Sequence, residues 1–290
     1  MEVGIIGVGL MGHGIARNVL LRGKHGLSFL DHPGNQPVDE LLSLGAKKLT
    51  SSADVAAASE VLILCVTGSP QVEQILTGTD GVVSHLRPGT VVVDCSTALP
   101  ESTERMARAV EEAGGRFIDA PMTRLPQHAH EGKLNLLVGG DPAILERVRP
   151  VLSCFAENIQ HVGAVGNGHR MKLLHNYVSV GSMSLLAEAA AQAADAGIDP
   201  KVFVEVLATG GGGGTALQRM APFITEGDRN SVPFFVSNAR KDIDYYRQMS
   251  EAAGARVSIA NGVVKALSEV IDDGHGQAYV SELTKLFRRS

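Results

Sequence analysis

The sequence contains few cysteines, and their arrangement excludes two classes of protein. Cys65, Cys95 and Cys154 are isolated and odd in number, and no Cys-x-x-Cys spacing occurs. This pattern suggests neither a disulfide framework nor a thiolate metal site.

Three further absences narrow the range of partners and compartments. The formal net charge is only −5 and the basic residues are scattered, so the chain lacks the electrostatic footprint of a protein that binds nucleic acid or an anionic membrane. The long apolar stretch at residues 171–197 is interrupted by charged and polar side chains, which predicts a buried helix rather than a membrane span. No secretory signal pattern opens the sequence. We therefore expect a reduced, cytoplasmic protein.

Glycine, in contrast, is abundant. The chain has 33 glycines in 290 residues, about 11%, against an average usage of about 7%. With 44% hydrophobic and 20% charged residues it is an ordinary globular protein, and its length favours two domains over one core.

The first part of the chain alternates short apolar runs with helical patterns, of which residues 11–23 and 101–114 are the clearest. Apolar runs that do not alternate in polarity are typical of strands buried on both faces, so we expect a parallel sheet with helical crossovers. The expected strands are Val3–Gly7, Leu27–Asp31, Val61–Val66, Val91–Asp94 and Leu134–Val138.

After about residue 163 no further strand is expected. Helical periodicity dominates residues 167–286, beginning with a long, alanine-rich helix within residues 166–197. The five glycines at 210–214 predict a loop, because glycine breaks helix propagation.

A Gly-x-Gly-x-x-Gly motif directly follows the first expected strand and opens a helix. Its first glycine allows a tight turn, the second lets a pyrophosphate approach the backbone, and the third permits close packing of helix on strand. The phosphate would then lie at the helix N-terminus, where free N–H groups and the helix dipole favour an anion. The expected cofactor-binding residues of this loop are Gly7, Gly9, Leu10, Met11 and Gly12.

Asp31 ends the next expected strand, at the distance where an acidic residue binds the ribose hydroxyls of a dinucleotide. A carboxylate would repel the 2′-phosphate of NADP, so Asp31 favours NAD, with NADP as the second cofactor.

Four separated motifs make the chain similar to the β-hydroxyacid dehydrogenases, which include the 3-hydroxyisobutyrate dehydrogenases. The resemblance covers nearly the whole sequence, and it implies an α/β N-terminal Rossmann dinucleotide-binding domain at residues 1–162 and a C-terminal all-α domain for substrate and oligomerisation at residues 163–290. The motifs are the glycine loop extended by Gly12–Asn18; Asp94–Pro100 followed by Phe117–Pro121; Gly166-x-Gly168-x-x-x-Lys172-x-x-x-Asn176; and Lys241-Asp242 after Phe234-Phe235.

The resemblance implies that Lys172 donates the proton during carbonyl reduction and accepts it during alcohol oxidation. An ammonium group beside the developing alkoxide both stabilises its charge and protonates it. A lone lysine near a helix start is more often a solvated charge, but apolar neighbours such as Met171 and Leu174 favour burial, which lowers a lysine pKa. Asn176, one turn later on the same face, is implied to orient the reacting oxygen or the lysine; the alternative is a structural buried amide.

By the same resemblance, Ser96 hydrogen-bonds the substrate and Thr97 contacts the nicotinamide side of the cofactor. Lys241 is implied to approach the cofactor across the cleft between the domains. The alternative for Lys241 is a surface ion pair with Asp242.

The substrate loop departs from the family pattern, which after Asp-Ala-Pro has a small residue and then Ser-Gly-Gly to cradle a carboxylate. Here Thr123, Arg124 and Leu125 follow Met122. Arginine offers a planar fork suited to a carboxylate, sulfonate or phosphate. This makes the chain similar to the branch with sulfolactaldehyde reductase and 4-hydroxybutyrate dehydrogenase. We expect Thr123 and Arg124 to bind substrate, the alternative being a surface arginine.

A second departure is His175, which replaces the first of two asparagines that often follow the family's lysine. It either supplies a donor to the distal anion of the substrate or is structural. His128 and His130 have His-x-His spacing, but no third ligand is near in sequence, so no metal is expected.

The sequence thus predicts an NAD(H)-dependent oxidoreductase that interconverts a small anionic aldehyde or ketone and its hydroxy acid. Succinic semialdehyde and 3-sulfolactaldehyde are the leading substrates, and 3-hydroxyisobutyrate or another short β-hydroxyacid is the alternative. A non-catalytic dinucleotide-binding module is the second alternative, and Lys172 counts against it. Because the family forms dimers and tetramers, we expect a homo-oligomer.

Overall fold

The computed structural model describes residues 1–79 and 81–288, which form two compact units, Met1–Lys172 and Leu173–Ser290. The division falls inside the long helix α8 (Asn167–Asp195), because this helix contributes side chains to the packing of both units. The expected domain boundary at residue 162 stays a prediction. The two units are described separately below.

Nine strands in the described part of the N-terminal unit form one sheet in the order β3-β2-β1-β4-β5-β6-β8-β7, with β9 beside β8. The strands from β1 to β6 are parallel. All five expected strands are present, together with four that the apolar pattern did not indicate, namely β3, β6, β7 and β9. The bounds are β1 (Glu2–Ile6), β2 (Gly26–Leu30), β3 (Lys47–Leu49), β4 (Val61–Leu64), β5 (Val91–Asp94), β6 (Arg116–Asp119), β7 (Met122–Thr123), β8 (Leu134–Gly139) and β9 (Ala156–Gly163).

The strand β8 corrects one expectation, because it runs antiparallel to β6 and β7 and is parallel only to β9. The reason is the short connection before it. Helix α6 (Pro126–His130) has five residues and spans about 8 Å, which is too short to return the chain to the starting edge of the sheet.

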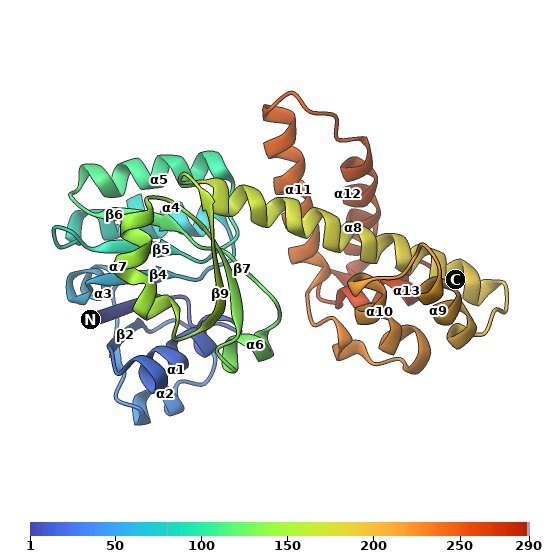
Figure 1. Cartoon of the computed structure of the whole chain (residues 1–290), viewed down its shortest axis with the longest axis horizontal. Coiled ribbons are helices and arrows are strands. Elements are labelled where there is room, and N and C mark those ends of the chain that lie inside the picture. The colour runs from blue at the N-terminus through green and yellow to red at the C-terminus, as the bar shows by residue number, and fades with distance from the viewer. Residues whose placement is uncertain (80, 289–290) are drawn as a thin grey trace. The chain divides into compact units, whose positions relative to one another are not determined.

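Helices cover both faces of the sheet, as Figure 1 shows. Successive side chains of a strand point to opposite faces, so Val61 and Ile63 of β4 join one core cluster while Leu62 and Leu64 join the other. The first cluster lies under α1, α6 and α7, and the second under α3, α4 and α5. The helical segments of this unit are α1 (Gly12–Gly23), α2 (Asp39–Ser43), α3 (Ser52–Ala58), α4 (Ser69–Thr77), η1 (Val82–His85), α5 (Pro100–Glu112), α6 and α7 (Pro142–Leu152). The expected α/β architecture is confirmed.

A buried amide joins α1 to α6. The side-chain nitrogen of Asn18 donates to the carbonyl oxygens of Gly14, Ala129 and His130 at 2.8, 2.9 and 3.0 Å. A Cβ at Gly14 would lie 2.6 Å from the backbone nitrogen of His130, so only glycine allows this approach. Helix α6, which follows the expected substrate loop, is therefore anchored on the helix that begins at the glycine loop.

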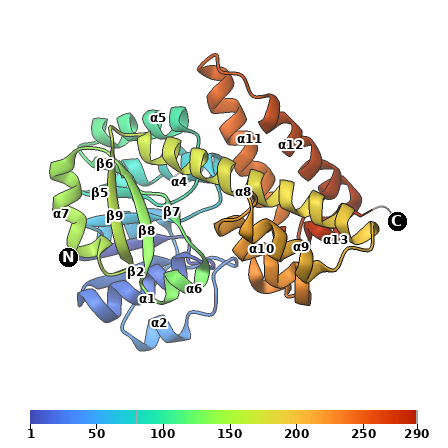
Figure 2. The same cartoon turned by 45° about the vertical axis from the view of Figure 1, so that its right-hand side comes forward.

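The described residues of the C-terminal unit form helices joined by loops, without a strand, and an isolated bridge pairs Phe235 with Tyr279. The C-terminal half of α8 packs with α10, α11 and α12 in one apolar core (Figure 2). The glycines at 210–214 form the loop between α9 and α10, as expected. The remaining segments are α9 (Pro200–Thr209), α10 (Thr215–Glu226), η2 (Arg229–Ser231), α11 (Val236–Ala252), α12 (Ser258–Val270), η3 (Ile271–His275), η4 (Val280–Glu282) and α13 (Leu283–Leu286).

Among the residues that the structure describes, we find no helix with the length and apolar character needed to cross a membrane.

We predict that Asn18→Ala lowers the free energy of unfolding by about 2–3 kcal/mol, because it removes three hydrogen bonds that a buried side chain donates to α1 and α6. Urea denaturation measures this change. The control is Asn158→Ala, which removes an exposed amide that makes one side-chain hydrogen bond and should cost far less. Equal losses of unfolding free energy in the two variants would contradict the role of Asn18 in joining α1 to α6.

Candidate functional site

The glycine loop has the geometry that an approaching phosphate needs. Gly7 has a φ of +101°, and a Cβ there would lie 2.8 Å from the carbonyl carbon of Cys65 at the end of β4. A Cβ at Gly12 would overlap the carbonyl oxygen of Gly7, whereas Gly9 faces open space. The amide of His13 donates to the carbonyl oxygen of Gly9 at 3.0 Å, so an anion at this helix N-terminus would bind the amides of the loop that precede it. The residues therefore fit a dinucleotide pyrophosphate.

The loop also lies where such sheets bind ligands. Strand order reverses between β1 and β4, which are neighbours although β2 and β3 separate them in sequence. Ligands of parallel α/β sheets bind outside the carboxyl ends of the strands at this switch point.

Asp31 follows β2 and is exposed, as a ribose-binding carboxylate must be. Its Oδ2 lies 3.1 Å from the Nζ of Lys48, a residue of β3 that sequence analysis did not consider. The cation beside Asp31 reduces the repulsion that this carboxylate would exert on a 2′-phosphate. A cross-strand contact of this kind could be found only with β3 in place.

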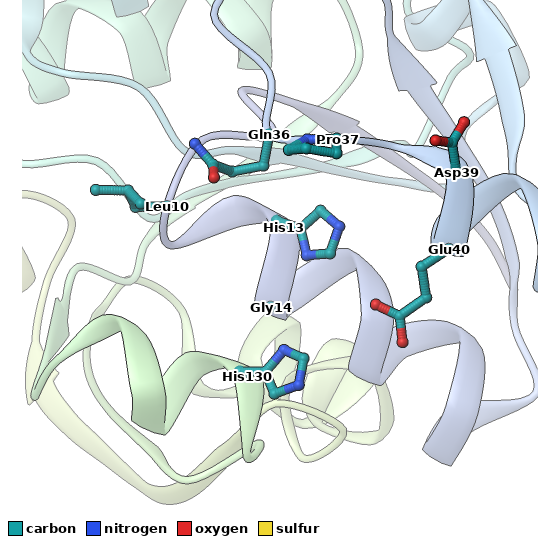
Figure 3. Close-up of a pocket in the computed structure, with 8 residues that line it drawn as sticks. All are labelled: Leu10, His13, Gly14, Gln36, Pro37, Asp39, Glu40 and His130. Carbon is teal, nitrogen blue, oxygen red and sulfur yellow. The ribbon is translucent and has the colours of Figure 1, made fainter.

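A pocket of about 390 Å³ adjoins the glycine loop in the N-terminal unit. Figure 3 shows the rings of His13 and His130 and the carboxylate of Glu40 turned toward the same space, from α1, α6 and α2. A 2.7 Å hydrogen bond from Arg17 lowers the pKa of Glu40, and the two imidazoles add to the effect. The pocket is lined by Leu10, His13, Gly14, Gln36, Pro37, Asp39, Glu40 and His130. Of the residues expected to bind the cofactor, only Leu10 is among them.

Ser96 and Thr97 lie in the turn after β5. Ser96 is 3% exposed, its backbone N–H donates to Asp94 Oδ1 at 2.9 Å, and its hydroxyl oxygen accepts from the backbone N–H of Val66 at 3.1 Å. Thr97 is half-buried. The Ser96 hydroxyl thus lies between the segments that follow β4 and β5, and it can still donate its single proton to a ligand.

Asp119 fixes the beginning of α8. Its two carboxylate oxygens each accept a backbone N–H at 2.8 Å, from Gly166 and from His169. A Cβ at Gly168 would lie 2.7 Å from Asp119 Oδ2, which explains the glycine at this position of the motif. Burial raises the pKa of Asp119, while the charge of His169 and the backbone hydrogen bonds oppose that shift.

Sequence analysis assigned no role to Asp119 or His169. Asp119 ends a strand that the apolar pattern missed, and His169 occupies a variable position inside the glycine motif. The one sequence signal for these two residues was their position inside the motifs Phe117–Pro121 and Gly166–Asn176.

Thr123 and Arg124 lie in the expected substrate loop. Thr123 is buried, and its hydroxyl accepts from Asn135 at 3.2 Å. Arg124 has a φ of +83°, the left-handed conformation that glycine adopts most easily. The backbone of this residue therefore lies in the region that favours glycine, the residue type that the family pattern has here.

The side chain of Arg124 is engaged elsewhere. Its guanidinium donates to the carbonyl oxygen of Lys133 at 2.5 Å and pairs with Glu157 at 2.6 Å. Glu157 belongs to β9, another strand that sequence analysis missed. The guanidinium of Arg124 is thus paired within the protein, and its expected role in binding the substrate stays a prediction.

Lys172 and Asn176 lie one turn apart on α8, so they share a helix face as expected. Lys172 is half-buried, and Met171 and Leu174 beside it are 41% and 43% exposed. The expected burial of Lys172 among apolar side chains stays a prediction.

A hydrogen-bonded chain connects the expected residues of the C-terminal unit. Asn176 donates from Nδ2 to Asp242 at 2.6 Å, and Lys241 Nζ pairs with the other oxygen of Asp242 at 2.7 Å. His175 Nδ1 lies 3.0 Å from Asn176 Oδ1, and Lys241 also lies over the ring of Tyr245. Asp242 is 3% exposed, so it is a buried acceptor that holds Asn176 and Lys241 together. The ion pair of Lys241 with Asp242, which was the alternative for Lys241, is therefore present, with a buried rather than a surface carboxylate, and the contact of Lys241 with a cofactor stays a prediction.

The described residues were searched for side chains that could bind a metal ion together. Across residues 1–79 and 81–288, no group of three or more His, Cys, Asp or Glu side chains could hold a metal ion.

Comparisons with known protein families cover almost the whole chain. Residues 2–163 match the family model described as the NAD binding domain of 6-phosphogluconate dehydrogenase. Residues 166–287 match the model described as the NAD-binding of NADP-dependent 3-hydroxyisobutyrate dehydrogenase.

Individual relatives agree with these models. The chain is 38% identical over 200 residues to 2-hydroxy-3-oxopropionate reductase of Escherichia coli (strain K12), covering 69% of this chain and 68% of the relative. It is 33% identical over 229 residues to 2-(hydroxymethyl)glutarate dehydrogenase of Eubacterium barkeri, with coverages of 79% and 75%. A crystal structure of 3-hydroxyisobutyrate dehydrogenase from Salmonella typhimurium matches 99% of both chains with a TM-score of 0.86 and 27% identity.

Proposed function

Because this chain belongs to the β-hydroxyacid dehydrogenase family of NAD(P)-dependent oxidoreductases, we propose that it interconverts a small anionic aldehyde or ketone and the corresponding hydroxy acid. The leading substrates are of the succinic semialdehyde or 3-sulfolactaldehyde type, and 3-hydroxyisobutyrate or another short β-hydroxyacid is the alternative. The names of the two relatives support an anionic substrate, since 2-hydroxy-3-oxopropionate and 2-(hydroxymethyl)glutarate are both carboxylates.

Helix α8 is the observation that carries this proposal. Its first turn is bound to the Asp119 carboxylate, and Lys172 and Asn176 follow on one face. Because the beginning of this helix is fixed, the lysine that follows it can hold its proton at a defined position, which acid–base catalysis requires.

When bound, the nicotinamide supplies or accepts the hydride. In the reductive direction Lys172 Nζ donates a proton to the substrate oxygen as negative charge develops there, and in the oxidative direction it accepts that proton. Ser96 donates its hydroxyl proton to the substrate, and Asn176, held by Asp242, orients the reacting end. Thr97 and Lys241 contact the cofactor.

We further propose that Arg124 binds the anionic tail through its backbone rather than through its guanidinium. Its left-handed conformation supports this choice, as does the pairing of its side chain with Glu157. Thr123 contributes its hydroxyl to the same turn, and His175 contributes to the substrate end of the hydrogen-bonded chain with Asn176.

Homo-oligomer formation is supported by exposed apolar side chains on one face of α8. Leu174, Val178 and Leu185 lie at helical spacing, and Val178 and Leu185 are 65% and 72% exposed. Apolar stripes of this kind commonly pack against another protein surface. The cytoplasmic location expected from the sequence stays a prediction.

We predict that Lys172→Ala lowers kcat for carbonyl reduction by about 10²–10⁴-fold, because the substrate oxygen loses its proton donor. Steady-state oxidation of NADH with a panel of short anionic aldehydes measures this effect. Lys265→Ala, which removes a highly exposed lysine of α12, is the control and should keep wild-type turnover. Wild-type turnover in Lys172→Ala with the best substrate would exclude the role in proton transfer.

We predict that Asp31→Asn lowers the preference for NAD over NADP by about tenfold or more, since the charge that binds ribose hydroxyls and repels a 2′-phosphate is lost. Lys48→Ala should raise the same preference, because it removes the cation beside Asp31. The ratio of kcat/KM for the two cofactors measures both changes. An unchanged ratio in both variants would show that this pair does not select the cofactor.

We predict that Arg124→Gly keeps the wild-type KM for anionic substrates and is more stable than Arg124→Ala by about 1 kcal/mol. Both variants lose the ion pair with Glu157, but only glycine adopts a positive φ without strain. Steady-state kinetics and urea denaturation test the two parts. A large, equal rise in KM in both variants would instead assign the tail to the guanidinium.

A further inference from the structure

His169 lies in the first turn of α8 and is completely buried. Its Nε2 lies 3.1 Å from the carbonyl oxygen of Ser96, and its Nδ1 lies 2.8 Å from the hydroxyl oxygen of Thr103. One imidazole thus joins three segments that are distant in sequence, namely the turn after β5, helix α5 and the beginning of α8.

Two buried carboxylates flank the same ring. Asp94 and Asp119 are both fully buried, and their Oδ2 atoms lie 4.0 Å from Nε2 and 3.7 Å from Nδ1. Among the described residues, Asp94 Oδ2 has no hydrogen-bond partner. A buried carboxylate oxygen without a donor is costly unless a nearby positive charge compensates it.

The hydrogen bonds favour such a charge. A carbonyl oxygen only accepts, so Nε2 must carry a proton to bond Ser96. The hydroxyl of Thr103 lies 3.1 Å from the carbonyl oxygen of Leu99 and can donate its one proton there, which leaves its oxygen to accept from a protonated Nδ1. With both nitrogens protonated, the ring is an imidazolium placed between two carboxylates.

Other titratable groups around the ring do not supply this charge. On the side of Asp94, burial raises the pKa of Cys65 to about 12 and raises that of Cys95 as well, so both thiols stay neutral. On α5, Glu104 is paired with Arg170 of α8 at 2.8 Å.

We propose that His169 is a positioning residue that, as a buried imidazolium, fixes the Ser96 turn to the helical turn that precedes Lys172. Lys172 follows three residues later, one turn along α8, so the bond from His169 to Ser96 sets the separation of the two groups that handle the substrate oxygen. The proposal rests on the proposed function for the roles of Ser96 and Lys172. The charge state of His169 does not depend on it.

Nitrogen-15 NMR of the full-length protein with NAD(H) bound tests the charge directly. We expect both ring nitrogens of His169 to carry protons at neutral pH, with the resonances assigned by their loss in His169→Gln. A ring with one bare nitrogen at neutral pH would overturn the proposal.

Kinetics of His169→Gln tests the positioning role. Glutamine can still donate one hydrogen bond but carries no charge, so we expect kcat to fall about tenfold or more while the dissociation constant for NADH is unchanged. In the wild type, the positive charge of His169 lowers the pKa of Asp119. Removal of that charge in His169→Gln therefore raises the pKa of Asp119 and moves the acidic limb of the kcat–pH profile to higher pH. His161→Gln, at an exposed histidine bonded to Gly140, is the control and should match wild type.

Stability against pH gives a readout without turnover. In His169→Gln the folded protein holds the Asp119 proton more tightly than the unfolded chain does, so the variant loses stability relative to wild type as pH rises above the ordinary range of an aspartate. A fall in kcat with no movement of either pH profile would indicate a purely structural side chain and overturn the proposal.

Thr103 provides a second pair of variants should His169→Gln fail to fold. Thr103→Ser keeps the hydroxyl and should keep kcat, whereas Thr103→Val removes the acceptor of Nδ1 and should lower kcat and shift the profile in the same direction. Wild-type behaviour of Thr103→Val would count against the proposal. If Lys172→Ala kept full turnover while His169 proved doubly protonated, the proposed function alone would fail.

Discussion

Asp119 accepts hydrogen bonds from two backbone N–H groups, and the rest of the N-terminal unit depends on this interaction. A carboxylate at the end of a parallel strand holds the amides of Gly166 and His169, and so determines where α8 begins and how it is turned. Helix N-termini favour negative charge, so the bond is strong although the carboxylate is buried. The glycine at 168 follows from it, because any side chain there would collide with the same carboxylate. Lys172 inherits its position from this contact.

Much of the fold could be predicted from the sequence. The run at Val61–Leu64 is apolar at every position and the run at Val91–Asp94 is apolar at every position but the last, and both proved to be central strands buried on both faces. The strands that escaped prediction, such as Lys47–Leu49 and Ala156–Gly163, lie toward the edges and carry exposed polar residues, so they lack that signal. The antiparallel direction of β8 depends on the length of α6, which the local pattern around residues 126–130 did not reveal.

For the candidate site, motifs located the residues but not their partners. The glycine loop could be predicted because its geometry is local, within Gly7–Gly12. The pairs Asp31–Lys48, Arg124–Glu157 and Asn176–Asp242 join residues that are 17, 33 and 66 positions apart, and such contacts exist only after the chain has folded. Arg124 is the most instructive of these residues. Its residue type suggested a ligand for anions, whereas its backbone angle lies in the region that favours glycine.

The amide of Asn18 links α1 to α6 through three carbonyl groups, and these carbonyls belong to the backbone rather than to particular side chains. Mutation of residues in α6 therefore leaves the acceptors in place. Between this anchor and the strand pairing of Thr123 with Asn135 lies the turn at 124–125, where position 124 needs a residue that tolerates a positive φ. A change of side chain in this turn leaves both of its ends fixed, so its effect stays local while α1 keeps its register against α6.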